Sequence, residues 1–269
     1  KIKDYGFENV ESLTTVTLPE GYGSEVFEEV GAYAFNHCTG LEGIEFPVTT
    51  TTIGAYAFND CSNASFTELF IPKSVSTIDA YAFTNCTSLE TVVFETGNTG
   101  LSTMEEYVFA NDAKITQIKV ADSLGADLTG LANSFPTSVT EIQEGALFNN
   151  ASLESFVVDK KVDTIGEQVF GGCISLRELT LPFVGNHRYA TNPEDATTFG
   201  YIFGTSLENI LEENQGLLAS VEQNKTIYYI PKSLTNVSIT DDTKIKDYGF
   251  ENVESLTTVT LPEGYGSEA

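Results

Sequence analysis

Basic residues are scarce in this sequence. Its 269 residues contain 13 lysines and arginines against 39 aspartates and glutamates, which gives a formal net charge of −26. Nucleic acids and anionic membrane surfaces attract basic patches, so this balance argues against either as a partner, and solubility is its ordinary consequence. The sequence also lacks a run of about 20 apolar residues and therefore predicts no transmembrane helix and no membrane insertion.

Cysteine and histidine are also rare, with four and two copies, and no CxxC pair occurs. Because structural metal sites gather several such residues, we expect no metal site. A phosphate-binding glycine loop and an EF-hand spacing are absent, and we expect no cofactor. Several pairs of acidic residues are adjacent in the sequence, and we interpret them as solvated loop charge rather than weak calcium sites; examples are Glu28 with Glu29, Glu105 with Glu106, and Asp241 with Asp242.

The N-terminus carries neither a starting methionine nor a signal peptide, as expected for a piece of a longer polypeptide. Residues 1–25 recur letter for letter at 244–268. A recent natural duplication of a whole array and an engineered duplication both explain this recurrence. We expect the parent polypeptide to continue past Ala269 with another near-identical array.

Repetition is what the sequence has in abundance. The stretch from Val75 to Phe94, VSTIDAYAFTNCTSLETVVF, carries an apolar pattern that returns along the chain. A unit of about 20 to 30 residues cannot bury its apolar face alone, so it must stack on copies of itself. The sequence therefore predicts a single solenoid domain over residues 1–269, with about nine coils.

Two apolar positions fix the register of the coils. We call the first the phenylalanine slot, filled by Phe7, Phe35, Phe58, Phe83, Phe109, Leu147, Phe170, Phe203 and Phe250. The second follows six residues later in most coils and is filled by Leu13, Leu41, Phe66, Leu89, Ile115, Leu153, Leu176 and Leu256. It begins a strand of pattern LxxVxL, whose side chains alternate between core and solvent. In the local sequence ALF at residues 146–148, the spacing favours Leu147 over Phe148 as the buried residue.

Two segments interrupt the pattern. Residues 121–138 are rich in Gly, Ser and Asp and predict a loop on one edge of the array. Residues 183–231 form the larger irregularity, in which the apolar residues from Leu207 to Val221 are roughly helix-spaced. This spacing predicts a short surface helix.

The third residue after the phenylalanine slot is the cysteine position. It holds Cys38, Cys61, Cys86 and Cys173, and in other coils Val10, Asp112, Asn150 and Val253. Valine at this position indicates a small, buried side chain, and asparagine and aspartate indicate a turn position whose side chain can bond the backbone. Disulfides between adjacent coils are the alternative, but the spacing typical of a disulfide scaffold is absent, so free buried thiols are favoured.

The repeated motif I-G-A-Y-A-F-N-x-C-x-x-L-x-x-I-x-x-P resembles the BspA-like leucine-rich repeats of bacterial surface proteins. The resemblance covers nearly the whole chain and includes the irregular coil from Tyr228 to Ile239. It implies an α/β-type repeat solenoid that is mainly β, with a curved array and a parallel concave sheet at LxxVxL. It also implies a short second strand at VxxI, a helical turn around AYAF on the convex side, and a secreted or cell-surface location in a bacterium.

The outward third and fifth residues of each LxxVxL are candidates for ligand binding. Phe70, Val93 and Val157, with the stem of Lys119 between them, would align as an apolar stripe that a ligand could bury. The strand preference of β-branched residues explains the valines equally well. The candidate concave-face residues are Glu45, Glu68, Phe70, Thr91, Val93, Gln117, Lys119 and Val157.

Tyrosines occupy the position two before the phenylalanine slot in seven coils. We expect their rings to pack along the convex edge with the hydroxyls in water, in preference to stacking on sugars or a partner protein. Catalysis is not expected, because a nucleophile and its base must lie within hydrogen-bond reach. His37 and Cys38 are neighbours in a turn, where side chains usually point apart.

We therefore expect a non-catalytic secreted or cell-surface protein whose concave face binds an extracellular protein or glycan. By the resemblance, adhesion to host or microbial macromolecules is the specific form of this function. The alternative is a structural spacer within a long repetitive surface protein. Because neither terminal coil is a dedicated cap, the fragment is also expected to self-associate end to end.

Overall fold

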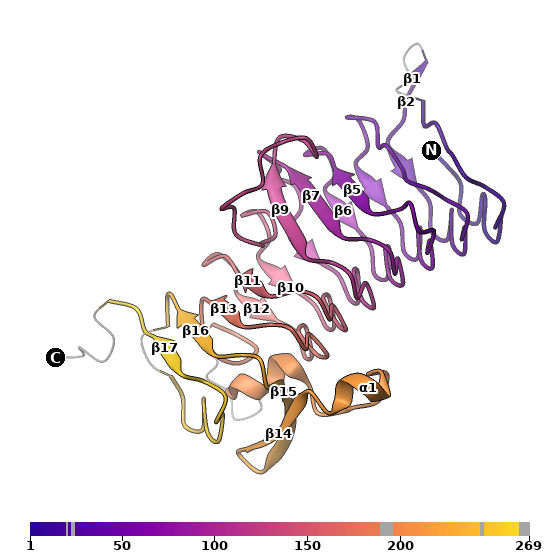
Figure 1. Cartoon of the computed structure of the whole chain (residues 1–269). Coiled ribbons are helices and arrows are strands. Elements are labelled where there is room, and N and C mark those ends of the chain that lie inside the picture. Colours follow the sequence, from indigo (N-terminus) through magenta and orange to yellow (C-terminus); the bar gives the residue numbers. More distant parts are fainter. Residues whose placement is uncertain (20, 23–24, 189–195, 243–244, 264–269) are drawn as a thin grey trace.

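The computed structural model of the chain describes all residues except 20, 23–24, 189–195, 243–244 and 264–269. The described chain winds into stacked coils, which add strands to a concave and a convex layer (Figure 1). Helix in the described part is limited to η1 (Phe199–Phe203) and α1 (Glu212–Gln215). The fold is a mainly β, parallel solenoid, as the sequence predicted.

The LxxVxL motifs form the concave layer as two parallel sheets. Leu69, Val92 and Ile118 are register partners and are fully buried, so the fourth residue of the motif faces the core. The first sheet contains β5 (Glu68–Ile71), β7 (Thr91–Glu95) and β9 (Gln117–Ala121), and the second contains β11 (Ser155–Val157), β13 (Glu178–Leu181), β16 (Asn236–Ile239) and β17 (Thr258–Thr260).

The VxxI positions form the convex layer from two-residue strands. Each strand places a polar residue outward and a buried apolar residue inward. The strands pair in parallel as β3 (Glu29–Val30), β4 (Thr52–Ile53) and β6 (Thr77–Ile78), and as β8 (Thr103–Met104), β10 (Glu141–Ile142) and β12 (Thr164–Ile165). The pairing stacks the apolar residues into one core.

The insertion at 121–138 does not stay at the edge. The backbone N–H of Ser134 donates to Ile118 O at 2.9 Å, and the N–H of Val157 donates to Asn133 O at 2.7 Å. Residues 133–134 therefore add a strand position between β9 and β11, whereas β8 and β10 on the convex side pair directly. The loop prediction was wrong on this point, because the segment widens the concave layer by about one strand spacing, roughly 4.8 Å.

Phenylalanine rings form a stacked ladder through the core. The rings of Phe7, Phe35, Phe58, Phe83 and Phe109 follow one another with centroid separations of 5.2, 5.2, 5.3 and 5.5 Å. Leu147 continues the slot and is fully buried, as the spacing predicted. Phe148 is buried too, against the prediction, because Ala110, Ile210 and Leu218 pack around it in a separate small cluster.

Tight turns, not the expected helical turns, occupy most of the AYAF stretches. In the coil of Phe58, Tyr56 has φ of 55° and Asp60 has φ of 59°. Left-handed residues two before and two after the slot end any right-handed helical path. The turns bond from coil to coil instead, as where the N–H of Phe58 donates to Ala82 O at 2.8 Å.

The tyrosine rings also stack face to face. The column of Tyr5, Tyr33, Tyr56, Tyr81 and Tyr107 has centroid separations of 5.0, 4.7, 4.6 and 5.1 Å. The inner rings therefore cover one another and offer no free face to a sugar.

The column ends at Tyr107. Its hydroxyl donates to Glu144 Oε1 at 2.5 Å and accepts from Gln168 Nε2, so it is not simply hydrated as expected. The next coil has Gly145 at the tyrosine position, with φ of 62°. A Cβ there would lie 2.4 Å from the Tyr107 ring, so no side chain fits.

The cysteine position holds a buried donor in most described coils. The Sγ of Cys86 donates to Phe58 O of the preceding coil at 3.3 Å, and Asn150 Nδ2 donates to Phe109 O at 2.7 Å. All four cysteines are free and buried, which confirms the prediction of free thiols. Burial raises the pKa of the Cys173 thiol to about 12.

The expected helix between Leu207 and Val221 is mostly absent. Only Glu212–Gln215 is helical, and the following residues form an antiparallel hairpin of β14 (Leu218–Gln223) and β15 (Thr226–Pro231). Its turn residues, Asn224 and Lys225, have φ of 45° and 66°. Left-handed pairs are typical of two-residue hairpin turns. A smaller pairing of β1 (Gly21–Tyr22) with β2 (Glu25–Val26) follows the first coil.

Candidate functional site

The concave layer opens into a groove near its N-terminal end. In the described chain, no backbone hydrogen bond joins residues 43–46 to β5 or residues 15–18 to residues 43–46. The convex side of the same coils stays closed, since β3 pairs with β4 and Ile2 forms a bridge to Val30. The strands thus separate on one side only and leave a groove of about 550 Å³.

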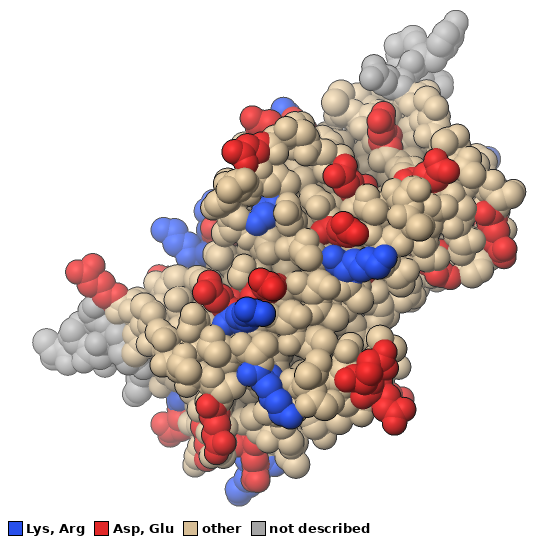
Figure 2. Space-filling view, viewed as in Figure 1, with Lys and Arg blue, Asp and Glu red and all other residues tan. Residues whose placement is uncertain are grey.

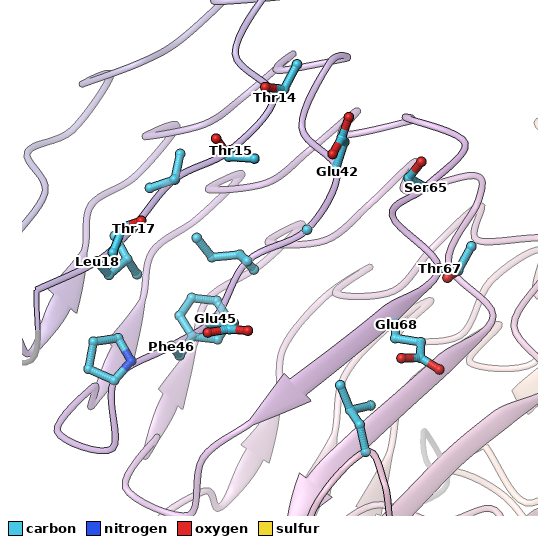
Figure 3. A pocket seen from close by; sticks show the side chains of 15 residues that line it. Thr14, Thr15, Thr17, Leu18, Glu42, Glu45, Phe46, Ser65, Thr67 and Glu68 are labelled. Atoms are coloured by element: carbon cyan, nitrogen blue, oxygen red, sulfur yellow. The ribbon is translucent and has the colours of Figure 1, made fainter.

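We call this feature the N-terminal groove. Hydroxyl and carboxylate side chains make up about half of its lining residues (Figure 3), and Leu124 of the 121–138 insertion is also among them. The residues that define it here are Thr15, Thr17, Glu42, Gly43, Glu45, Thr67, Glu68 and Leu124.

Gly43 leaves an open position in this lining. It is the third residue of its motif, so Thr15 and Glu68 are its counterparts on the flanking coils. A Cβ placed on Gly43 would meet no atom within 4 Å. Beside it, Ile44 and Phe46 are 8% exposed and contribute apolar surface to the lining. The result is an open slot with apolar surface next to polar walls.

The groove has an unbalanced negative charge. No lysine or arginine lines it. None of the ion pairs among the described residues involves Glu42, Glu45 or Glu68. Figure 2 shows red side chains over the coils around and before β5 in this view, whereas most blue side chains lie toward the C-terminal half. Cationic groups are therefore the chemistry that this surface attracts.

The predicted apolar stripe is aligned but not exposed. Phe70, Val93 and Lys119 are register partners on β5, β7 and β9, as expected. Val93, however, is 0% exposed and Lys119 only 8%, so the prediction that both face solvent was wrong. The Lys119 Nζ donates to Leu131 O at 2.5 Å, and burial lowers the pKa of its ammonium. The 121–138 insertion lies over this part of the sheet.

The other predicted residues divide between the groove and its surroundings. Glu45 and Glu68 line the N-terminal groove. Phe70, Thr91, Gln117 and Val157 are half-buried and lie outside it. Val157 is also separated from Lys119, because Ser134 forms the bridge to Val157.

A second, smaller depression lies beyond the insertion. It has a volume of about 220 Å³ and is lined mainly by polar outward residues of β13, β16 and β17. Those residues are Glu178, Thr180, Asn236, Ser238, Thr258 and Thr260. The covered centre therefore separates two depressions on one concave layer.

Candidate catalytic and metal-binding residues do not assemble. His37 Nδ1 lies 2.5 Å from Asp60 Oδ2, while the Sγ of Cys38 donates to Phe7 O at 3.1 Å. The two side chains thus have different partners, and burial raises the pKa of the Cys38 thiol. Among the residues that the structure describes, no cluster of three or more His, Cys, Asp or Glu side chains is suited to hold a metal ion.

The sequence matches the profile of a protein family described as the BspA type leucine rich repeat region. The match comprises six copies over residues 1–126, 131–190 and 222–267. The chain belongs to this family. A search of curated protein sequences found no match.

Solved structures of two leucine-rich repeat proteins agree with the fold. A leucine-rich repeat protein of T. pallidum, TpLRR, is 26% identical with a TM-score of 0.51, over 60% of this chain and 66% of that one. A leucine-rich repeat protein of Bacteroides ovatus is 22% identical with a TM-score of 0.53, over 97% of this chain and 58% of that one. This BspA-type chain thus spans less than two thirds of each of these relatives.

The described helices are all too short or too polar to cross a bilayer. Sequence reasoning on this BspA-type array missed Gly43 and Leu124 as groove residues. A glycine at an outward strand position was the available signal for Gly43, because its neighbours at that position carry side chains. Leu124 had no signal, since nothing periodic places the insertion.

Proposed function

We propose that this BspA-type repeat protein is a non-catalytic binding protein of the bacterial surface or secreted space. It holds an extracellular protein in the N-terminal groove and so contributes to adhesion. The observation that carries this proposal is the one-sided opening of the coils, which produces a groove at residues 43–46. A spacer has no need of such an opening, because a closed, polar sheet is sufficient to stack coils.

The groove suits an extended segment of a partner protein. The backbone of residues 43–46 makes no ladder with either neighbouring coil in the described chain, so its N–H and C=O groups are available. Segments that add to an open sheet use such groups for affinity and side-chain pockets for specificity. A glycan ligand is the alternative outcome of the experiment below.

A groove-filling substitution tests this function. Gly43→Tyr should abolish most adhesion to immobilised extracellular proteins or cells, because its ring occupies the slot. The backbone of Gly43 is outside the left-handed region and its Cβ meets nothing, so the melting temperature should stay unchanged. Adhesion is measured with beads that carry either the wild-type chain or the variant.

The matched control is Thr180→Tyr, which places the same ring in the second depression. It should leave adhesion intact. If Gly43→Tyr beads adhere as well as wild type, the N-terminal groove is not the binding site. If Gly43→Tyr lost adhesion to glycan-coated surfaces but kept adhesion to protein-coated surfaces, the groove would be assigned to a glycan ligand.

The terminal coils support a second proposal, end-to-end self-association of this chain, which also suits a spacer. Tyr5, Phe7 and Val10 of the first coil are exposed, as are Tyr248, Val259 and Leu261 of its duplicate. The tyrosine and phenylalanine rings stack from coil to coil over the first five coils, so we expect the exposed rings of one end to stack on those of another end. The net charge of −26 opposes this contact at low salt.

Light scattering over a salt and concentration series should therefore show larger particles at high protein and high salt. Phe7→Ser combined with Val10→Ser should reduce the association, because both side chains lie at the open end. A wild-type chain that stays monomeric throughout would contradict this proposal.

A further inference from the structure

We propose that the occupant of the N-terminal groove is an extended, lysine- or arginine-bearing segment of a partner protein, with one basic side chain seated in the slot at Gly43. This inference rests on the proposed function and adds the chemistry of the partner. Shape, charge and open backbone groups support it independently.

The slot has the shape for one long side chain. Thr15 and Glu68 lie on the coils on either side of Gly43. Their backbones are therefore two strand spacings apart, at least about 10 Å. Nothing lies within 4 Å of the position that a Cβ on Gly43 would take. Lysine and arginine bury an aliphatic stem while the charged head stays near water or a counter-charge. Ile44, Phe46 and Leu124 supply apolar surface for the stem.

The charge selects the head group. Glu42, Glu45 and Glu68 all line the groove and have no cationic partner among the described residues. Figure 3 shows Glu45 and Glu68 on neighbouring coils, with Glu42 further along the groove. An acidic segment would be repelled, and a neutral one would leave the carboxylates without a counter-charge. Complementary charge gives specificity and speeds association.

The open backbone favours an extended segment over a free amine. Residues 43–46 present hydrogen-bonding groups that no neighbouring coil uses in the described chain. An extended peptide meets such groups at every second residue and projects its alternate side chains toward the sheet. The partner segment is thus held by its backbone hydrogen bonds as well as by the charge of the basic side chain that enters at Gly43.

Peptide probes test the inference. A lysine-containing peptide of about twelve residues, long enough to cross the groove, is compared with the same peptide carrying acetyl-lysine and with a glutamate version. Acetylation keeps the stem and removes the charge. At about 150 mM salt, where long-range attraction is screened, isothermal titration calorimetry should show binding of the lysine peptide and at least roughly tenfold weaker binding of the other two.

Charge-neutral variants locate the effect. Glu45→Gln with Glu68→Gln should weaken the lysine peptide about tenfold, as expected for the loss of two exposed ion pairs of up to about 1 kcal/mol each. The matched control is Glu212→Gln with Glu213→Gln on α1, which changes the net charge equally at exposed positions outside the groove. This control should bind like wild type.

The outcomes separate the inference from the proposed function. Equal binding of the lysine and acetyl-lysine peptides, or equal weakening by both double variants, overturns the inference. In that case, adhesion that is still lost in Gly43→Tyr leaves the proposed function standing with a neutral ligand. Adhesion unaffected by Gly43→Tyr overturns the proposed function itself.

Discussion

Phe83→Ala should destabilise the folded chain by about 3–5 kcal/mol, the usual cost of truncating a buried aromatic side chain. The Phe83 ring is fully buried and stacks on Phe58 at 5.3 Å and on Phe109 at 5.5 Å. The coil-to-coil backbone bonds hold the neighbouring rings in place, so the cavity left by alanine cannot close easily. Denaturant unfolding followed by circular dichroism measures the loss.

Phe7→Ala provides the matched control, because Phe7 fills the same slot in the first coil. It is 40% exposed, and among the described residues its ring stacks on that of Phe35 alone. Its loss should be less than half that of Phe83→Ala. A loss of less than about 1 kcal/mol in the free energy of unfolding for Phe83→Ala would mean that the phenylalanine slot contributes little to the stability of the fold.

Asp112→Asn should stabilise the folded chain at neutral pH by about 1–3 kcal/mol, the cost of an unsatisfied buried polar group. Asp112 is fully buried at the cysteine position, and neither carboxyl oxygen has a hydrogen-bond partner in the described chain. Burial raises the pKa of Asp112 well above its ordinary value, and the nearby backbone N–H of Cys86 lowers it by a smaller amount.

The next coil already has an amide side chain at the cysteine position. Asn150 occupies the same position and its Nδ2 donates to the slot carbonyl of Phe109 at 2.7 Å. The corresponding acceptor for residue 112 is the carbonyl of Phe83. An ionised carboxylate has no proton to donate to it, whereas asparagine does.

The pH dependence gives a second readout of Asp112. The pKa of this carboxyl is raised in the folded state above about 3.9, its value in the unfolded chain, so the folded state retains the proton more strongly. The stability that this retention contributes is complete below the unfolded pKa and is lost as the pH rises toward the folded pKa. The advantage of Asp112→Asn should therefore grow from pH 4 to pH 7.

Urea unfolding of both proteins at the two pH values measures this difference. Asp127→Asn is the control, because the hydroxyl and N–H of Thr129 lower the pKa of this exposed carboxyl and give the opposite sign. It should bring no gain at pH 7. A pH-independent difference between wild type and Asp112→Asn would show that the carboxyl is not buried in its neutral form.

Much of the fold follows from spacing. Every interior coil packs between two coils of the same pattern. The residues that fill the phenylalanine and leucine slots therefore recur at similar intervals and reveal the register. The same argument placed Leu147 in its slot without a phenylalanine there. The left-handed tyrosines were not predictable, because tyrosine has no preference for positive φ and only the stacked turns hold it there.

The candidate site depended on other information. Strand alternation correctly placed Val93 on the outward face, but whether that face meets solvent depends on residues 121–138, whose path no period describes. Glu45 and Glu68 were chosen from the same alternation and do line a groove. The groove itself could not be predicted, because it results from missing bonds between residues 43–46 and their neighbours.

The sequence by itself therefore determined the solenoid, its register, its acidic charge and the inward or outward direction of each strand residue, since these depend on local periodicity and composition. Only the tertiary structure decided which outward residues are accessible. It placed residues 133–134 between two strands, covered Val93 and Lys119, and opened the coils around Gly43. These outcomes depend on contacts between segments distant in the chain, and no repeat encodes them.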